Sequence, residues 1–152
     1  MRQDATPDAS ASTRFTPNLV HEMAQRLSNG PHAVKQLESN SPLRNISYDQ
    51  YRDIRIDPQH AIWRNDPVPF RVDVLPAGFL FHDPVWIAIV ENGLAREITA
   101  PPGAFLLGPL VEKQLANATI PLSGFRVRST INSRAIWDEF LVFQGASYFR
   151  AV

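Results

Sequence analysis

Two adjacent carboxylates, Asp138 and Glu139, form a pair of the kind that acid–base catalysis requires. Glycoside hydrolysis uses two carboxyl groups about 5–9.5 Å apart, one on each side of the scissile bond. Both residues precede an aromatic and β-branched run typical of a strand, where neighbouring side chains point to opposite faces. One sugar therefore cannot meet both, and we predict no catalytic residue here but at most one ligand contact, assigned to Glu139.

A second charged stretch, residues 48–56, alternates acids and bases around Tyr51. Read as a strand, it has one mixed face and one polar-aromatic face. Two interpretations remain open. The charges of Asp49, Arg52, Asp53 and Arg55 could form a cross-strand ion-pair ladder. Alternatively, the stretch forms the polar wall of a ligand groove, with Tyr51 as a platform for a sugar ring.

Arginines and aromatics supply the remaining candidates for sugar binding. Forked guanidinium donors suit the hydroxyl rim of a sugar, which points to Arg126 and Arg150. Tyr148 and Phe149 point to opposite faces, so one of them is exposed or lines a groove. Trp63 and Trp137 are alternative platforms, although tryptophan is more often a core residue. The predicted substrate-binding residues are Tyr51, Arg52, Arg126, Glu139, Tyr148 and Arg150. We expect residues 138–150 and 48–55 to meet on one wall of a groove.

The sequence contains no pattern typical of metal binding, serine hydrolysis, nucleotide binding or thiol catalysis. The four histidines lack the spacing of a metal site, so no metal is predicted. Ser147 lacks the glycine-flanked elbow of a serine hydrolase, and no phosphate loop or dinucleotide fingerprint is present. The chain has no cysteine, which excludes disulfides and thiol catalysis. No cofactor is predicted.

Composition narrows the class of partner. Fifteen basic and fifteen acidic side chains leave no net charge on the 152 residues, so neither nucleic acid nor an anionic membrane is the expected partner. No run approaches the roughly 18 apolar residues of a membrane span. Oligomeric state cannot be read from the pattern. A hydrophobic content of 44% is sufficient for the core of one domain.

These candidate residues are predicted to lie mainly on strands. Residues 1–14 are small and polar and are predicted to form a flexible leader. A helix follows, with Thr16 as N-cap, Pro17 at its first position and Asn29-Gly30 as its end. We expect a second short helix within residues 31–39, and both helices to pack onto a sheet. One or two helical turns are predicted within residues 111–118.

Strands are predicted at residues 48–56, 70–74, 79–81, 85–90, 94–99 and 125–128, and on both sides of Gly145. The Asn92-Gly93 pair predicts a hairpin between the run 85–90, expected to be buried, and the run 94–99. The run 140–143 is expected to be covered on both faces. The predicted fold class is mainly β, with two packed antiparallel sheets in a β-sandwich and short N-terminal helices.

Four ordered strings carry a resemblance to a known family. They are Asp138-Glu139 with Gly145–Val152, Tyr48–Ile56 with Ala61–Arg64, Val68–Phe70 with Gly78–Phe81, and Pro121–Arg126 with Ile131-Asn132. Together they resemble bacterial periplasmic glucan biosynthesis proteins of the OpgG/OpgD (MdoG) type, from about Phe15 to the last residue. The resemblance implies a large galactose-mutarotase-like β-sandwich, followed in full-length members by an immunoglobulin-like domain.

The family implies a periplasmic protein that binds or processes an osmoregulated glucan with a β-1,2-linked glucose backbone. Some members hydrolyse such glucans internally, and the acids for that reaction are expected beyond this region. The alternatives are a non-catalytic carbohydrate-binding or assembly module and an inactive gene fragment. Residues 15–152 are thus expected to be the front part of a truncated domain. The start lacks the apolar core of a signal peptide, so we expect the sequence to begin after the cleavage site.

Overall fold

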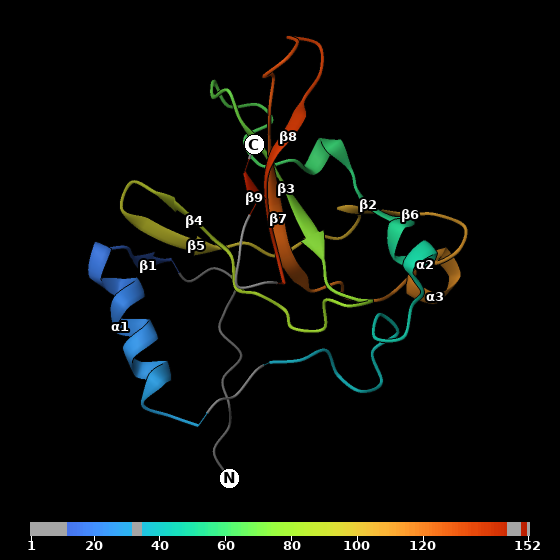
Figure 1. The fold of residues 1–152 in the computed structure, drawn as a ribbon, viewed down its shortest axis with the longest axis horizontal. Helices are drawn as coiled ribbons and strands as arrows, with labels where there is room; N and C mark the ends of the chain where they lie inside the picture. Colours follow the sequence, from blue (N-terminus) through green and yellow to red (C-terminus); the bar gives the residue numbers. More distant parts are fainter. Residues whose placement is uncertain (1–11, 32–34, 146–149, 152) are drawn as a thin grey trace. The chain divides into compact units, whose positions relative to one another are not determined.

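The computed structural model describes residues 12–31, 35–145 and 150–151. The chain forms two compact units, one from residues 1–34 with 86–99 and the other from residues 35–85 with 100–152. Figure 1 labels the elements of both. Antiparallel strands dominate the described residues, and helices are few and short. The predicted fold class, mainly β with antiparallel sheets, is confirmed.

The first unit contains a small antiparallel sheet with strand order β1-β5-β4. Its strands are β1 (Thr13–Arg14), β4 (Ala88–Glu91) and β5 (Leu94–Glu97). Asn92 and Gly93 have φ angles of 51° and 75° and join β4 to β5, as expected for an Asn-Gly hairpin turn. The hairpin prediction is confirmed. The prediction of a buried strand is wrong, because Trp86 and Val90 are exposed.

Helix α1 (Pro17–Ser28) begins after Thr16 and ends at Asn29, as the sequence predicted. Proline at the first position already has the φ angle of a helix, which explains the start even though the Thr16 side chain makes no capping hydrogen bond. None of the helix residues is buried, and Leu27 is 75% exposed. The expectation that this helix packs its apolar face onto a sheet is therefore wrong.

The second unit opens with a correction, because Tyr48–Arg52 is not a strand but helix α2. Ser47 Oγ accepts a hydrogen bond from the Gln50 amide at 3.2 Å, and Gln50 Oε1 accepts one from the Ser47 amide at 2.9 Å. This reciprocal capping box satisfies two donors at the helix start and outweighs the strand preference of the two tyrosines. Residues 35–39 are not helical either, which contradicts the predicted second helix for that part of it.

Strand β2 (Ile54–Ile56) begins only after α2 and pairs with β6 (Phe105–Leu107). The short helix η1 (Pro58–His60) follows β2 in the sequence, and α3 (Glu112–Leu115) follows β6. Helix α3 confirms the helical turn predicted within residues 111–118. Leu43, Val111 and Leu115 are fully buried in the core of this unit. Asp53 accepts a hydrogen bond from the Leu110 amide at 2.9 Å and so ties α2 to the segment before α3.

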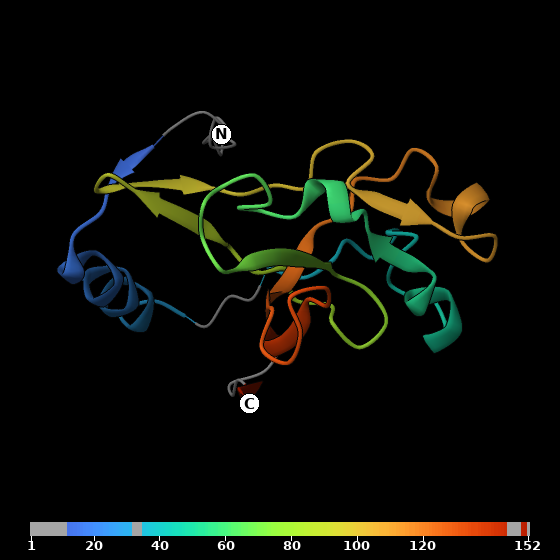
Figure 2. The ribbon, with the colours of Figure 1, turned by 90° about the horizontal axis from the view of Figure 1, so that it is seen from above.

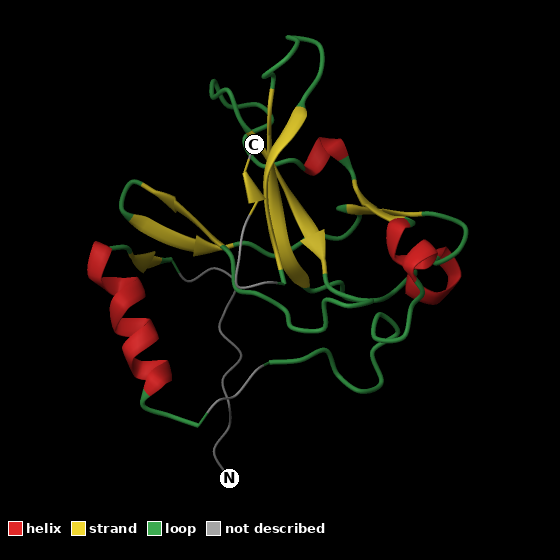
Figure 3. Ribbon diagram, viewed as in Figure 1, coloured by secondary structure: helices red, strands yellow, loops and turns green. Residues whose placement is uncertain are grey.

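A four-stranded antiparallel sheet with order β3-β7-β8-β9 is the larger of the two sheets of the second unit. Its strands are β3 (Arg71–Pro76), β7 (Leu122–Ser129), β8 (Asp138–Gln144) and β9 (Arg150–Ala151). Figure 2 shows β3 in green, β7 in orange and β8 in red from above, and Figure 3 shows the same strands in yellow. Strands predicted at residues 70–74, 125–128 and on both sides of Gly145 are confirmed. Strand β8 is half-buried, so the expectation that it is covered on both faces is wrong.

Candidate functional site

A group of charged side chains lies on one face of the four-stranded sheet, around Asp73. This carboxylate is 0% exposed. Arg126, its neighbour across the sheet, donates from Nε to Oδ2 at 2.9 Å. Arg128 donates from Nη2 to Oδ1 at 2.8 Å. A buried carboxylate is costly unless it is paired and hydrogen-bonded, and both of its oxygens are occupied here.

We call this group the arginine face; its members are Arg71, Asp73, Arg126, Arg128 and Glu139. Three guanidinium groups against two carboxylates leave one net positive charge. Arg126 Nη1 lies 3.5 Å from Glu139 Oε2, and the two side chains are 35% and 45% exposed. Arg126 is therefore fixed on one side by a buried carboxylate, while its other side remains accessible beside an exposed acid.

Within the arginine face, Arg71 contacts the aromatic ring of Trp137. The Arg71 guanidinium lies over the Trp137 ring, 3.8 Å from its centroid, which is a cation–π contact. The Nε atoms of Arg71 and Arg128, which are neighbours across the sheet, are buried and have no hydrogen-bond partner among the described residues. This face therefore has more donors than acceptors, a property that suits ligands rich in oxygen acceptors.

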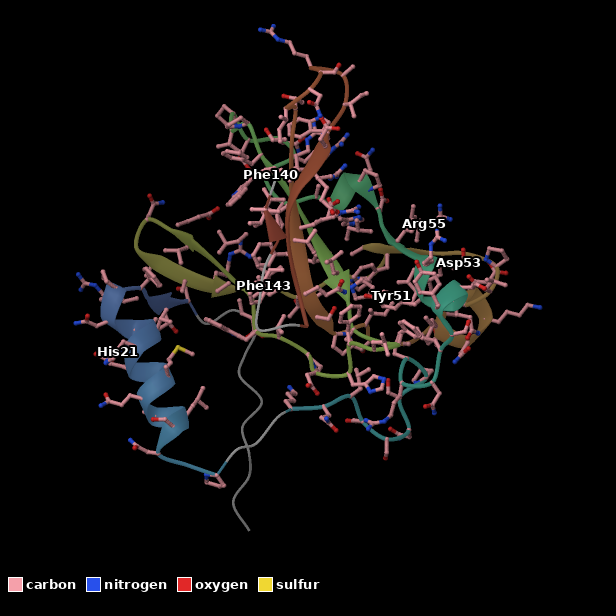
Figure 4. All side chains as sticks on the ribbon, viewed as in Figure 1. His21, Tyr51, Asp53, Arg55, Phe140 and Phe143 are labelled. Atoms are coloured by element: carbon pink, nitrogen blue, oxygen red, sulfur yellow. The ribbon has the colours of Figure 1, made fainter. Side chains whose placement is uncertain are left out.

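A polar cluster joins the sheet to α2. The Tyr51 hydroxyl donates to the Pro76 carbonyl at 2.8 Å, and Ser123 Oγ donates to the same carbonyl at 2.7 Å. Gln144 Nε2 donates to both hydroxyl oxygens, at 2.6 Å to Tyr51 and 2.9 Å to Ser123. Figure 4 shows Tyr51 between α2 and the strands of the sheet. Burial raises the pKa of the Tyr51 phenol, and the hydrogen bonds with Gln144 and Ser123 oppose that rise.

The two stretches that were expected to meet do so at this cluster, since Tyr51 belongs to one and Gln144 to the other. Tyr51 also packs against Phe79 and Phe81, with ring centroids 6.1 and 5.7 Å away. Its hydroxyl is engaged within the protein, and the residue as a whole is half-buried.

The other predicted site residues lie in different places. Arg126 and Glu139 are in the arginine face. Arg52 is exposed on α2, with its guanidinium 5.6 Å from the Tyr48 ring centroid. Arg150 lies in β9 opposite Val142, which is itself opposite Arg126 on β7. Tyr148 lies outside the described residues.

The ion-pair ladder expected in residues 48–56 is wrong, because most of that stretch is helical. Its closest oppositely charged pair, Arg55 and Asp53, is 3.9 Å apart, and Arg55 is 71% exposed. Such a pair contributes little to stability. Sequence reasoning missed Asp73, Arg71 and Gln144. One signal could have found the first two: charges at every second position, with Arg71 and Asp73 on one predicted strand and Arg126 and Arg128 on another.

The carboxylates of this region are held apart. Asp138 Oδ2 accepts hydrogen bonds from the Asn132 amide and Nδ2, each at 3.2 Å, whereas Glu139 contacts Arg126. Asp73 is buried and cannot reach a glycosidic oxygen. The arrangement thus suits recognition of hydroxyl groups rather than proton transfer. Within the described residues, no three His, Asp or Glu side chains lie close enough to hold a metal, and no helix is long and apolar enough to cross a membrane.

Comparison with known proteins identifies one family. Residues 15–152 match a family described as "Periplasmic glucan biosynthesis protein, MdoG". "Glucans biosynthesis protein G" of Shewanella sp. (strain MR-4) is 39% identical over 138 residues, which is 91% of this chain and 25% of the relative. The protein of the same name from Shewanella baltica (strain OS155) is 40% identical over 138 residues, 91% of this chain and 26% of the relative. The chain spans about a quarter of the length of the curated relatives it matches.

Proposed function

The chain belongs to the family of periplasmic glucan biosynthesis proteins, MdoG, and from this membership we propose that its arginine face binds the glucose backbone of a periplasmic glucan. The proposed ligand is a β-1,2-linked chain, and the proposed place of action is the periplasm. The glucan lies along the exposed side of Arg126 and Glu139 in this proposal. Strand β9, with Arg150, borders the same part of the sheet.

The observation that carries the proposal is the position of Arg126 between Asp73 and Glu139. A glucose ring offers hydroxyl oxygens that both accept and donate hydrogen bonds. Arg126 supplies donors in a fixed plane, and Glu139 supplies an acceptor beside them. Because Asp73 already holds the guanidinium in place, little conformational entropy is lost when a sugar binds to it.

Aromatic side chains near this face support the same ligand. The Trp137 ring lies against Arg71, and Phe140 lies 5.8 Å from Phe70 between ring centroids. Binding sites for small ligands combine such apolar surfaces with a few well-placed polar groups. Arg52 and Tyr148, both predicted from the sequence, are proposed as further contacts of a longer glucan.

We propose binding rather than hydrolysis as the task of this part of the protein. The carboxylates of Asp73, Asp138 and Glu139 are respectively buried, held by Asn132 and held by Arg126. Hydrolysis needs two carboxyl groups facing one bond. Any hydrolytic step would use acids from outside this region, and a non-catalytic role in glucan assembly uses the same face.

Calorimetric titration of the full-length protein with a linear β-1,2-linked glucose oligosaccharide tests the proposal. Glu139→Ala removes the exposed acceptor, and we expect it to weaken binding about tenfold, or by about 1.4 kcal/mol. The matched control is Glu91→Ala, which removes an exposed acid from β4. Equal affinities of wild type, Glu139→Ala and Glu91→Ala would remove the arginine face as the binding site.

A further inference from the structure

A separate cavity of about 710 Å³ lies in the second unit, bounded by residues 35–42, Pro84 and residues 113–121. None of the members of the arginine face lines it. Its volume is within the range of roughly 300–1,000 Å³ that is usual for small-molecule sites. The family membership and the proposed glucan site leave this cavity without a role.

The charges around this cavity set it apart from the rest of the chain. The sequence contains only two lysines against thirteen arginines, and both lysines, Lys35 and Lys113, line the cavity. Among the described residues of the lining, Glu38 is the one acid, which leaves the lining one net positive charge. A second acid, Asp83, lies next to the lining, where its Oδ1 accepts a hydrogen bond from Gln36 Nε2 at 3.2 Å. A lysine ammonium is a compact point charge on a flexible stem, which suits a small anionic group such as a phosphate.

Neutral side chains complete the lining with hydrogen-bonding groups and rigid apolar surface. Amides come from Asn40 and Asn117, and hydroxyls from Ser41 and Thr119. Gln36 and Gln114 also line the cavity, with their amide nitrogens already donating to Asp83 and to the Pro42 carbonyl. Pro42, Pro84 and Pro121 add apolar rings to the same walls. Amides and hydroxyls can both donate to and accept from ligand hydroxyl groups, while the proline rings can cover the C–H surface of a sugar.

Hydrogen bonds and buried side chains hold the chain segments that form the cavity walls. Gln114 Nε2 donates to the Pro42 carbonyl at 2.9 Å, which ties the two longer segments together. Leu37 and Leu115 are buried and anchor one segment each. The Ala77 amide donates to the Pro121 carbonyl at 2.7 Å, which attaches that end of the wall to the residue after β3. A site that is already formed avoids much of the ordering cost of binding.

We propose that this cavity, the lysine pocket, is a second binding site and takes an anionic sugar. The ligand is a sugar ring that carries a phosphate group. Its anionic group lies between Lys35 and Lys113, and its ring contacts the amides and prolines. The lysine pocket is separate from the arginine face, and it can bind its ligand whether or not that face binds glucan.

Glucose 6-phosphate, glucose and inorganic phosphate are the probes that test the pocket. We expect full-length protein at low salt to bind glucose 6-phosphate at least about tenfold more tightly than either glucose or phosphate. Added sodium chloride should weaken that binding, because the lysines are exposed. Phosphate that binds as tightly as glucose 6-phosphate would overturn the sugar, and equally tight glucose would overturn the anion. Absence of glucose 6-phosphate binding would overturn the whole proposal.

Substitutions locate the binding. The double variant Lys35→Gln/Lys113→Gln should lose at least about tenfold in affinity for glucose 6-phosphate, and its melting temperature should stay near that of the wild type because both side chains are exposed. Arg55→Gln is the control, since it removes a similarly exposed cation outside the pocket. A double variant that binds like Arg55→Gln would overturn the location. The neutral oligosaccharide described above tests the arginine face separately, so either proposal can fail alone.

Discussion

The Tyr51 hydroxyl and the Gln144 amide nitrogen lie 2.6 Å apart, although the two residues are 93 positions apart in the sequence. The contact joins helix α2 to the end of strand β8. Through Pro76 and Ser123 it also includes the ends of β3 and β7. A buried polar group without a partner is expensive, so this cluster holds together only when α2 and three strands are in place at once. It fixes the sheet whose opposite end carries the arginine face.

Removal of the Tyr51 hydroxyl should therefore destabilise the protein. We expect Tyr51→Phe to lower the free energy of unfolding by about 1–3 kcal/mol, because Gln144 loses an acceptor in a part-buried site. Urea denaturation measures the change. Tyr48→Phe is the matched control, since Tyr48 is 56% exposed and keeps its ring against Phe79 as phenylalanine. Equal losses in the two variants would contradict the role assigned to the cluster.

The same hydroxyl makes stability depend on alkaline pH. Burial raises the pKa of Tyr51 above its ordinary value of 10.0. Above pH 10 the unfolded chain releases this proton while the folded protein still holds it, so stability is lost as pH rises. The contribution is complete below that pH. Unfolding free energies measured at several pH values should fall more steeply above pH 10 in the wild type than in Tyr51→Phe. Parallel curves would show that Tyr51 is not the group responsible.

Asp73 should be the most sensitive position of the arginine face. Asp73→Asn removes the charge that pairs with Arg126 and Arg128 and leaves two guanidinium groups in a part-buried site. Breaking a buried pair in this way costs about 3–5 kcal/mol, which should appear as a lower urea midpoint. Asp66→Asn, at an exposed position, should change stability by less than about 0.5 kcal/mol. A tolerated Asp73→Asn would mean that the ion pairs do not hold the sheet.

Gly124 on β7 lies directly opposite Gln144 on β8. A Cβ atom at this position would clash with the Phe143 carbonyl oxygen and would lie 2.7 Å from Gln144 Cα. Both obstacles belong to the backbone, so the strands would have to separate, and we expect Gly124→Ala to cost about 1–3 kcal/mol. At Gly30 the nearest atom to such a Cβ is 3.9 Å away, so Gly30→Ala serves as the control. Melting temperatures that match in the two variants would argue against the close approach.

Local patterns in the sequence predicted much of this fold. Asn92-Gly93 specified its turn, and Pro17 specified the start of α1, because each effect depends on neighbouring residues alone. The alternation of arginines with apolar residues correctly predicted strand β7. The prediction failed at Tyr48–Arg52, where Ser47 and Gln50 form a capping box that the tyrosine-rich, alternating pattern concealed.

The site was harder to predict because its contacts are distant in the sequence. Arg126 and Glu139 were predicted from their types, but the residue that holds Arg126 is Asp73, which is 53 positions away. That pairing depends on the register of β3 against β7, and no local pattern sets the register between strands so far apart. Likewise, Tyr51 was expected at an open surface, and only its contact with Gln144 reveals that its hydroxyl is engaged inside the protein.

Arg126 is proposed to recognise glucan, and the glucan affinity of Arg126→Lys measures this role. Lysine retains the charge beside Asp73 but loses the planar fork of donors. Calorimetric titration of the full-length protein with a linear β-1,2-linked glucose oligosaccharide should show binding at least about tenfold weaker than in the wild type. Arg55→Lys, the exposed control, should bind within about twofold of the wild type. A folded Arg126→Lys variant that binds as tightly as Arg55→Lys would contradict the claim.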